Sequence, residues 1–243
     1  MNIYCINLDR ALDRKEYITK HWIENLGLDI TFWSAYDRRK IENNEFYFRY
    51  DALLSQEAIR RPLSAGEIAC ATSFYQLFEF ILKNDIQECI IMEDDAVPLI
   101  TSKDIIFDSI NKSKLEFPSL ELLLMHKISP IQAKNHDPSW GSTYEEIFNV
   151  KKESSSLCKS SPWGNQCFYI TKKGLEIVWK HLIRDSHAPI IAYPADYFST
   201  NSLCPQKMVA ILNNPICDHD WIGSNSTTYI GNRLRGTHRK FIP

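Results

Sequence analysis

Apolar residues in the first part of the chain form two short runs with an amphipathic stretch between them. Residues 2–8 and 30–35 are rich in β-branched and aromatic residues, a composition typical of strands. Between the runs, Ile18, Trp22 and Leu26 recur every four residues, which predicts one face of a helix. Because the order is strand, helix, strand, we expect a parallel pair of strands joined by a right-handed crossover.

Capping patterns predict where two helices begin. Asp13, with Glu16 three residues later, is placed to cap the first helix, and Gly27 is placed to end it. Ser64 and Glu67 form a capping box ahead of a second helix. The spacing of apolar residues predicts that this second helix is largely buried. These apolar residues are Ile68, Ala71, Phe74, Tyr75, Leu77, Phe78, Ile81 and Leu82.

Further apolar runs predict strands in the rest of the chain, at residues 89–92, 120–125, 165–170 and 207–212. Thr171 is placed to cap another helix, which ends near Arg184. The alternation of strands and helices predicts an α/β fold with a mainly parallel sheet flanked by helices. We find no repeat and no linker that would divide the chain into separate domains.

Three polar segments interrupt this pattern. Residues 36–62 are charged and weakly periodic, and we assign them to an excursion with one short helix. Residues 126–164 are rich in serine, lysine and proline. A loop of this length is often a functional lid, so we predict that this segment is a lid. We predict that the whole chain, residues 1–243, is a single domain. The tail, residues 233–243, is locally basic. We expect it either to be a solvated chain end or to contact an anionic membrane surface.

Composition narrows the class of protein. A hydrophobic fraction of 44% and a charged fraction of 24% are ordinary for a globular protein, and a net charge of -2 gives no reason to expect a nucleic acid as partner. The seven cysteines include no C-x-x-C pair, which is typical of reduced thiols in the cytosol. The first residues lack the pattern of a signal peptide, and no stretch has the roughly 20 apolar residues of a membrane span. We therefore expect a soluble, cytoplasmic protein.

Three consecutive carboxylates, Glu93-Asp94-Asp95, directly follow the apolar run at residues 89–92. Carboxylates this close repel one another unless a cation or hydrogen-bond donors compensate. The carboxyl end of a strand is also where open α/β sheets bind ligands. In extended backbone, residues two apart share a face, so Asp95 and one neighbour can bind a Mg²⁺ or Mn²⁺ ion that carries phosphate oxygens. The remaining carboxylate then orients a sugar or the loop. The alternative is a solvated acidic turn.

The loop after the first strand is the usual position for a nucleotide in this kind of fold. It contains no glycine, so neither G-x-G-x-x-G nor a phosphate-binding P-loop is present. Dehydrogenases and P-loop kinases are therefore disfavoured. Arg10 and Arg14 lie where guanidinium groups can meet a base, a ribose or a phosphate. The alternative is that both are solvated charges at the start of a helix.

Two later positions are candidates for chemistry. Asp196 lies among the aromatic residues of 193–198, a setting that raises the pKa of a carboxyl and suits a sugar ring, although Asp196 is equally suited to cap a helix. His219 lies in the polar cluster 218–221 next to a tryptophan. If this part of the chain folds back onto the acidic triplet, His219 completes a metal shell. A surface turn is the competing interpretation.

Several stretches match the motifs of one enzyme family in order and spacing. They are Ile6 to Arg10 with Arg14, Ala35 to Asp37, Leu63 to Ser73, Ile91 to Asp95 and, more loosely, Gly164 to Gly174 and Pro194 to Asp196. Through them the chain, over roughly residues 2 to 200, resembles glycosyltransferase family 25, the lipooligosaccharide-biosynthesis galactosyltransferases. The chain also departs from the pattern, because Phe74 occupies a position where the family commonly has histidine.

The resemblance implies a GT-A-like fold in which Glu93 to Asp95 act as the family's D-x-D equivalent. They would hold Mn²⁺ or Mg²⁺ against the diphosphate of a UDP-sugar. Asp95, Glu93 and His219 are then the expected metal ligands. Asp196 is the expected base for the acceptor hydroxyl. The expected donor-site residues are Asn7, Leu8, Arg10, Arg14, Asp37, Gly66, Glu67, Glu93 and Asp94, with Asp37 and Arg14 on the uridine side.

The activity implied is inverting transfer of galactose from UDP-galactose to a core oligosaccharide of lipooligosaccharide or lipopolysaccharide. A lipid-linked acceptor would place the protein on the cytoplasmic face of a bacterial inner membrane. A UDP-glucose-dependent transferase is an alternative within the family. A sugar nucleotidyltransferase is disfavoured because the first loop lacks a glycine-rich phosphate site. A non-catalytic glycan- or nucleotide-binding subunit of surface-polysaccharide assembly is the third possibility, and retention of all three acidic residues argues against it.

Overall fold

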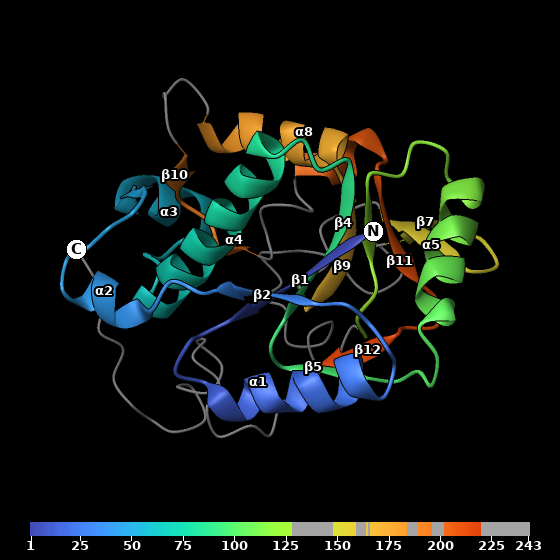
Figure 1. Ribbon diagram of the computed structural model, residues 1–243. Coiled ribbons are helices and arrows are strands. Elements are labelled where there is room, and N and C mark those ends of the chain that lie inside the picture. Colours follow the sequence, from blue (N-terminus) through green and yellow to red (C-terminus); the bar gives the residue numbers. More distant parts are fainter. Residues whose placement is uncertain (128–147, 159–163, 165, 184–188, 196–201, 220–243) are drawn as a thin grey trace.

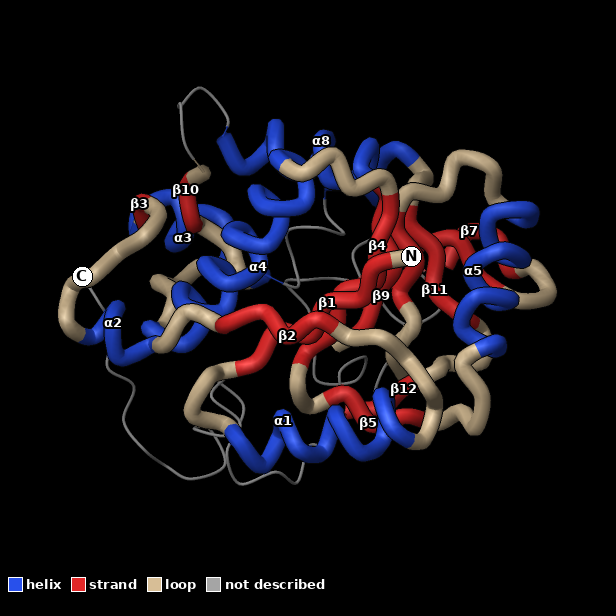
Figure 2. The backbone as a smooth tube through the Cα atoms, viewed as in Figure 1, coloured by secondary structure: helices blue, strands red, loops and turns tan. Residues whose placement is uncertain are grey.

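An eight-stranded sheet forms the centre of the molecule (Figures 1 and 2). The computed structural model describes residues 1–127, 148–158, 164, 166–183, 189–195 and 202–219. In spatial order the strands are β2 (Thr31–Ser34), β1 (Asn2–Asn7), β4 (Glu88–Glu93), β9 (Cys167–Thr171), β6 (Leu122–Leu124), β11 (Val209–Leu212), β8 (Ser155–Cys158) and β7 (Phe148–Lys151).

Most strands of this sheet run in the same direction. β1 is parallel to both β2 and β4, and β6 is parallel to β11. Among the described strands of the sheet, β9 lies antiparallel between β4 and β6, and β8 lies antiparallel between β11 and β7. The predicted α/β fold with a mainly parallel sheet is confirmed, as is the parallel β1–β2 pair. The direction of β9 was not predicted, because an apolar run has the same pattern in either direction.

Helices cover both faces of the sheet (Figure 2). Helices α4 and α8 pack on one face, and α1 and α5 pack on the other. Alternate residues of the central strands enter the two cores: in β1, Tyr4 faces the α4 side and Ile3 faces the α1 side. The bounds are α1 (Leu12–Ile18), α4 (Ala65–Lys83), α5 (Asp104–Glu116), α8 (Lys172–Ile183) and a short 3-10 helix, η3 (Cys204–Gln206).

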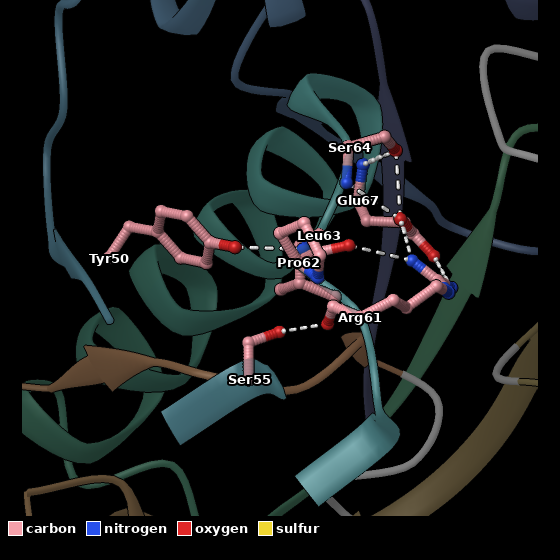
Figure 3. Close-up of polar contacts among 7 residues, drawn as sticks. All are labelled: Tyr50, Ser55, Arg61, Pro62, Leu63, Ser64 and Glu67. Atoms are coloured by element: carbon pink, nitrogen blue, oxygen red, sulfur yellow. Dashed lines mark hydrogen bonds and ion pairs between the residues drawn. The ribbon is translucent and has the colours of Figure 1, made fainter. Parts of the chain in front are cut away.

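Helix α4 begins at the predicted capping box (Figure 3). Ser64 Oγ accepts a hydrogen bond from Glu67 N (3.3 Å), and Glu67 Oε2 accepts one from Ser64 N (2.8 Å). The predicted apolar face is buried, with Phe74 1% exposed and Tyr75 0% exposed. Burial of a large apolar side chain contributes about 1.5–3 kcal/mol, against about 1 kcal/mol for a helix cap. Packing therefore supplies most of the stability of this helix, and the cap fixes where it begins.

Helix α1 begins earlier than predicted and without a side-chain cap. Its N-cap is Ala11, and Asp13 lies in the first turn, so the predicted capping by Asp13 is wrong. The turn before the helix is held through Ala11 instead. The Ala11 N–H donates to the carbonyl of Leu8 (2.8 Å), and the Ala11 carbonyl accepts from Asn7 Nδ2 (3.3 Å). Contacts to the end of β1 thus replace the capping box that the sequence suggested.

The chain beyond α1 continues as a π-helix, η1 (Thr19–Glu24), whose Trp22 is buried. Trp22 Nε1 donates a hydrogen bond to the carbonyl of Ala96 (2.9 Å), which ties this helix to the residue after the acidic triplet. Gly27 follows with a φ of +70°. It ends the helix as predicted, because glycine adopts the left-handed conformation without a Cβ clash.

The excursion at residues 36–62 contains two short helices rather than the one predicted. They are α2 (Arg38–Glu42) and α3 (Ala52–Ile59). Each is capped by an aspartate, Asp37 and Asp51 respectively, whose side chain accepts a backbone N–H of the first turn. The second helix was not predicted because its apolar residues lack a clear helical period.

Two small sheets account for the remaining described strands. β3 (Arg49–Tyr50) pairs with β10 (Ile190–Ile191), and β5 (Ala96–Pro98) pairs with β12 (Cys217–His219). Within the predicted lid, the described residues 148–158 form the antiparallel strands β7 and β8, which extend the central sheet. The rest of the lid between 128 and 163, and the tail 233–243, lie outside the described residues.

All seven cysteines lie in the described part of the chain as free thiols, and six of them are buried. Burial raises the pKa of the Cys89 and Cys204 thiols to about 12. These groups are therefore protonated and unreactive at neutral pH. None of the described helices is long and apolar enough to cross a membrane.

Candidate active site

The acidic triplet lies at the edge of the sheet where β1, β2, β4 and β6 have their carboxyl ends. Strand β4 ends at Glu93, and Asp94 and Asp95 form the turn that leads into β5. Helix α4 runs back along the sheet before β4 begins, so its first turn is at this same edge (Figure 1). The loop after β1, the capped start of α4 and the acidic turn therefore lie at one edge of the sheet.

The middle carboxylate of the triplet is held by the loop after β1. Asp94 is 9% exposed, and its two oxygens accept hydrogen bonds from Asn7 Nδ2 (2.8 Å) and Arg14 Nη1 (2.6 Å). A buried carboxylate is costly unless such donors compensate it, and removing one partner of a buried ion pair costs about 3–5 kcal/mol. Asp94 is therefore the carboxylate that orients the loop, and Glu93 and Asp95, both partly exposed, flank it.

Arg14 is the positive charge beside the triplet. Partial burial tends to lower the pKa of Arg14, but the ion pair with Asp94, reinforced by the charges of Asp95 and Asp13, raises the pKa above its ordinary value. The guanidinium is thus permanently charged and lies in the field of more than one carboxylate. Its predicted contact with uridine is untested, and its described contact is with the protein.

The carboxylate of Asp37, which was predicted to contact uridine, is hydrogen-bonded to neighbouring arginines. Its carboxylate accepts hydrogen bonds from Arg10 Nε (2.9 Å) and Arg39 Nη2 (2.7 Å), and it also caps α2. Partial burial opposes ionisation, but the hydrogen bonds from Arg39 and Arg10 outweigh it and hold the pKa of Asp37 well below its usual range. Arg10 and Asp37 therefore link the loops after β1 and β2, and whether a nucleotide contacts them stays a prediction.

The start of α4 is built around an ion pair that the sequence did not reveal (Figure 3). Arg61 donates from Nη1 and Nη2 to the two oxygens of Glu67, at 2.9 Å and 2.5 Å, while Ser64 supplies the capping contacts. Burial opposes ionisation of Glu67, but Arg61 and Ser64 lower its pKa. Gly66 lies in the same turn. The described contacts of the Glu67 carboxylate are with the protein, so its predicted role in donor binding is untested.

Strand β12 brings the chain at residue 219 beside the residue that follows the acidic triplet, and the role of His219 as a metal ligand stays a prediction. β12 is antiparallel to β5, and His219 is opposite Ala96, the residue immediately after Asp95. The neighbouring Asp218 forms an ion pair with Lys127 at 3.0 Å. This register brings the backbone of residue 219 to the acidic turn. Asp196, the predicted base, lies outside the described residues.

Three residues at this edge were not predicted. Glu93 N donates to the carbonyl of Gln166 (2.9 Å), and His126, at the end of β6, is 1% exposed. Gly164 has a φ of +111°, and a Cβ there would lie 2.7 Å from His126 Nε2 and 2.6 Å from Gln166 Oε1. Glycine is therefore required at this position. No local pattern predicted this cluster, because its members meet only through the pairing of β4, β6 and β9.

The donor set of the acidic turn fits a hard divalent cation. Within the described residues, no group of three or more histidine, cysteine, aspartate or glutamate side chains is arranged to hold a metal by itself. Mg²⁺ and Mn²⁺ bound with a nucleotide need only one or two carboxylates, since phosphate oxygens supply further ligands. Glu93 and Asp95 are the pair predicted for this role, which stays a prediction, and the Asp94 oxygens accept hydrogen bonds from Asn7 and Arg14.

Fold and site together define an α/β protein with an acidic turn at the ligand-binding edge of its sheet. The family model described as glycosyltransferase family 25 (LPS biosynthesis protein) matches residues 1–198. The chain belongs to glycosyltransferase family 25, which confirms the resemblance seen in the sequence.

Individual relatives agree with this assignment. A glycosyltransferase 25 family member of Anopheles gambiae is 32% identical over 97 residues, which are 39% of this chain and 16% of that protein. A glycosyltransferase 25 family member of Aedes aegypti is 30% identical over 97 residues, which are likewise 39% of this chain and 16% of that protein. The aligned part is thus a small fraction of the insect proteins.

Among solved structures, mouse xyloside xylosyltransferase 1 has a TM-score of 0.44 and 10% identity, covering 87% of this chain and 84% of that chain. A glycosyltransferase involved in glycosylation of the major capsid of PBCV-1 has a TM-score of 0.36 and 10% identity, covering 97% and 98%. The family assignment rests on the sequence matches.

Proposed function

We propose that the protein is a metal-dependent, inverting glycosyltransferase that moves a hexose, galactose, from a UDP-sugar to a hydroxyl of an oligosaccharide acceptor. One observation carries the proposal. In a chain of glycosyltransferase family 25, the acidic turn Glu93 to Asp95 follows β4 at the edge of the sheet where open α/β folds bind ligands.

The roles of the residues follow from the charge that develops during transfer. Glu93 and Asp95 would hold Mn²⁺ or Mg²⁺ against the diphosphate, with His219 as a third ligand from β12. The ion, when bound, supplies Lewis-acid neutralisation of the departing UDP. Asp196 would take the proton from the acceptor hydroxyl as that hydroxyl attacks the opposite face of the sugar.

The acceptor we propose is a core oligosaccharide of lipooligosaccharide or lipopolysaccharide. This choice is supported by the family description, which names LPS biosynthesis. A lipid-linked acceptor would be met at the cytoplasmic face of an inner membrane, where the basic residues of 233–243 would approach anionic lipid headgroups. The matched relatives are insect proteins, so the bacterial setting is part of the proposal.

Transfer is tested by incubating the protein with Mn²⁺, UDP-galactose or UDP-glucose, and an acceptor ending in lactose or glucose. Released UDP and the glycosylated product are measured. We expect Glu93→Ala and Asp95→Ala to lower kcat/KM by more than about 100-fold, since a metal supplies several kcal/mol of transition-state stabilisation. Glu121→Gln is the control, because it removes a carboxylate that lies at the other edge of the sheet, beside the start of β6.

Full metal-dependent transfer by the two alanine variants would show that the site is misplaced. Faster transfer from UDP-glucose than from UDP-galactose would show that glucose, and not galactose, is the sugar transferred. If the protein bound UDP and Mn²⁺ but transferred neither sugar to any acceptor, the non-catalytic binding subunit would be the better description.

The role of Asp196 is tested by measuring kcat and the KM for the UDP-sugar separately in the Asp196→Asn variant. We expect Asp196→Asn to lower kcat by about 10²–10⁴-fold, the usual contribution of a general base. The KM for the UDP-sugar should stay near the wild-type value, because the base acts on the acceptor. Unchanged kcat in this variant would assign the base to another residue.

A further inference from the structure

Two arginine side chains meet on one carboxylate oxygen at the edge of the sheet that carries the candidate active site. Asp37 Oδ2 accepts hydrogen bonds from Arg10 Nε (2.9 Å), Arg39 Nε (3.0 Å) and Arg39 Nη2 (2.7 Å). The second oxygen, Oδ1, accepts the backbone N–H of Arg39 (3.0 Å). A carboxylate accepts about four hydrogen bonds, so these contacts fill the capacity of Asp37. Asp37 is therefore suited to hold the two guanidiniums together and not to bind a ligand itself.

The two guanidiniums retain donors and charge that Asp37 does not use. The side chains of Arg10 and Arg39 are 46% and 65% exposed, whereas that of Asp37 is 14% exposed. Toward the described residues, Arg10 donates through Nε alone, and both of its Nη groups are left for another partner. Asp9, Arg10 and residues 37–42 together contain four basic and three acidic side chains, so this corner of the edge has a net charge of about +1.

This arginine pair is separated from the acidic turn by a strand. β1 and β2 are parallel, with Asn7 opposite Ser34, so the loops that carry Arg10 and Asp37 leave the sheet at the same edge. β4, which leads into the acidic turn, lies on the other side of β1. Neighbouring strands are about 4.8 Å apart, so β2 and β4 are about 10 Å apart. A diphosphate held at the acidic turn would lie on the far side of β1 from β2, which leaves the arginine pair for a second anionic group.

We propose that Arg10 and Arg39 bind a phosphate or carboxylate group carried by the acceptor sugar, and that Asp37 is the residue that positions them. Guanidinium groups bind these oxyanions through pairs of N–H donors in a fixed fork. The inference rests on the proposed function and deepens it, because it defines the acceptor as an anionic saccharide. Phosphorylated sugars and sugar acids share the chemistry that the pair would recognise.

Binding of simple sugars tests this site without any transfer reaction. The probes are glucose 6-phosphate, glucuronate and glucose, and ligand-observed NMR gives their dissociation constants. We expect the wild type to bind at least one anionic sugar about 10-fold more tightly than glucose, the effect of one hydrogen bond to a charged group. Tighter binding of glucose 6-phosphate than of glucuronate identifies the group as a phosphate, and the reverse order identifies a carboxylate. Equal binding of all three sugars would overturn the inference.

Substitutions at position 39 test the paired guanidiniums. Arg39→Gln should lower the preference for the anionic sugar about 10-fold. Arg39→Lys keeps the charge but loses the fork of donors, so it should lower the preference as well. A preference that survives in Arg39→Lys would show that charge alone acts, and would contradict a positioned pair. Arg49→Gln is the matched control, because Arg49 is an exposed arginine that pairs with Asp51 at 3.8 Å, in β3 of a separate small sheet. It should leave the preference unchanged.

Asp37→Asn separates positioning from net charge. This variant removes a negative charge, so an effect of charge alone would strengthen the binding of anionic sugars. We expect weaker binding instead, because the two guanidiniums repel each other and are no longer held on one oxygen. Stronger binding would overturn the positioning role. Asp37 also caps α2, so thermal unfolding is measured for each variant. If Asp37→Asn does not fold, Arg39→Lys decides.

The donor nucleotide is the alternative partner of the arginine pair. The dissociation constant of UDP with Mn²⁺ should be unchanged in Arg39→Gln. Equal losses of UDP and of the anionic sugar would assign the pair to the donor and overturn the inference. If the wild type prefers anionic sugars but transfers no hexose, the proposed function fails and the anion site stands. If it transfers hexose without any preference for anionic sugars, the inference alone fails.

Discussion

At the scale of single residues, the three acidic side chains of the triplet have different surroundings. Asp94 is buried against Asn7 and Arg14, whereas Glu93 and Asp95 are partly exposed on either side of it. The sequence argument expected one carboxylate to face away from the other two, but it assumed extended backbone, whereas Asp94 and Asp95 form a turn. It did not predict the partners of Asp94, since Arg14 is 80 residues away in the chain.

Gly164 is a residue at which the backbone itself limits substitution. We expect Gly164→Ala to lower the free energy of unfolding by about 2–4 kcal/mol. The added Cβ would clash with His126 and Gln166, and the alanine would be strained by the positive φ of this position. Gly27→Ala is the comparison, since Gly27 has a φ of +70° and only the flexible end of Lys103 within reach. It should cost about 1 kcal/mol. Urea denaturation measures both, and equal losses would contradict the clash.

At the scale of elements, local rules succeeded where a helix or strand is decided by its own residues. The capping box of α4 and the stop at Gly27 are both present. The predicted start of α1 was wrong, because the helix start is decided by the contacts of Asn7 and Leu8 with Ala11 and not by the capping pattern at Asp13. Strand direction and the ion pair between Arg61 and Glu67 were not predictable, since neither leaves a period or a spacing rule in the sequence.

The start of α4 gives a pH-dependent prediction. The pKa of Glu67 is lowered in the folded protein, so its ionised form contributes stability above the ordinary value of 4.5, and that contribution is lost as the pH falls through the folded-state pKa. We expect Glu67→Gln to cost about 3 kcal/mol at pH 7, because Arg61 is left without its carboxylate. The difference between wild type and variant should shrink towards pH 3.

Denaturant unfolding at pH 7, 5 and 3 checks this expectation. Glu121→Gln provides a second partly buried ion pair for comparison, at the other edge of the sheet. A Glu67→Gln penalty that is the same at all three values of pH would mean that packing, and not charge, holds the start of the helix.

At the scale of the whole molecule, the chain is a sheet covered by helices on both faces, with six of its seven cysteines buried in the layers. The sequence predicted this class of fold, because apolar strands alternate with amphipathic helices. It did not predict that the described part of the 126–164 segment contributes the strands β7 and β8. Serine and lysine at 151–156 gave that segment the composition of a loop.

Burial of the thiols predicts how the folded protein reacts with a thiol reagent. We expect one of the seven cysteines, Cys70, to react rapidly with Ellman's reagent in the native state, because it is the partly exposed one. All seven should react after unfolding in guanidinium chloride. Cys70→Ser should abolish the rapid phase and leave the total six. Rapid reaction of several thiols in the native protein would show that the helices separate readily from the sheet and expose the buried cysteines.

The antiparallel strand β9 also determines when the centre of the sheet is able to form. β4 and β6 do not pair with each other, and residues 167–171 must be inserted between them. During synthesis, the ribosome has to release these residues before the two halves of the sheet join. Gln166, to which Glu93 N donates, is released just before these residues, whereas β12, which pairs with β5 after the acidic turn, is released later still. The pairing of the acidic turn with β12 is therefore available only late in synthesis, and nascent chains that stop before β9 contain the acidic triplet without the strands β9 and β12.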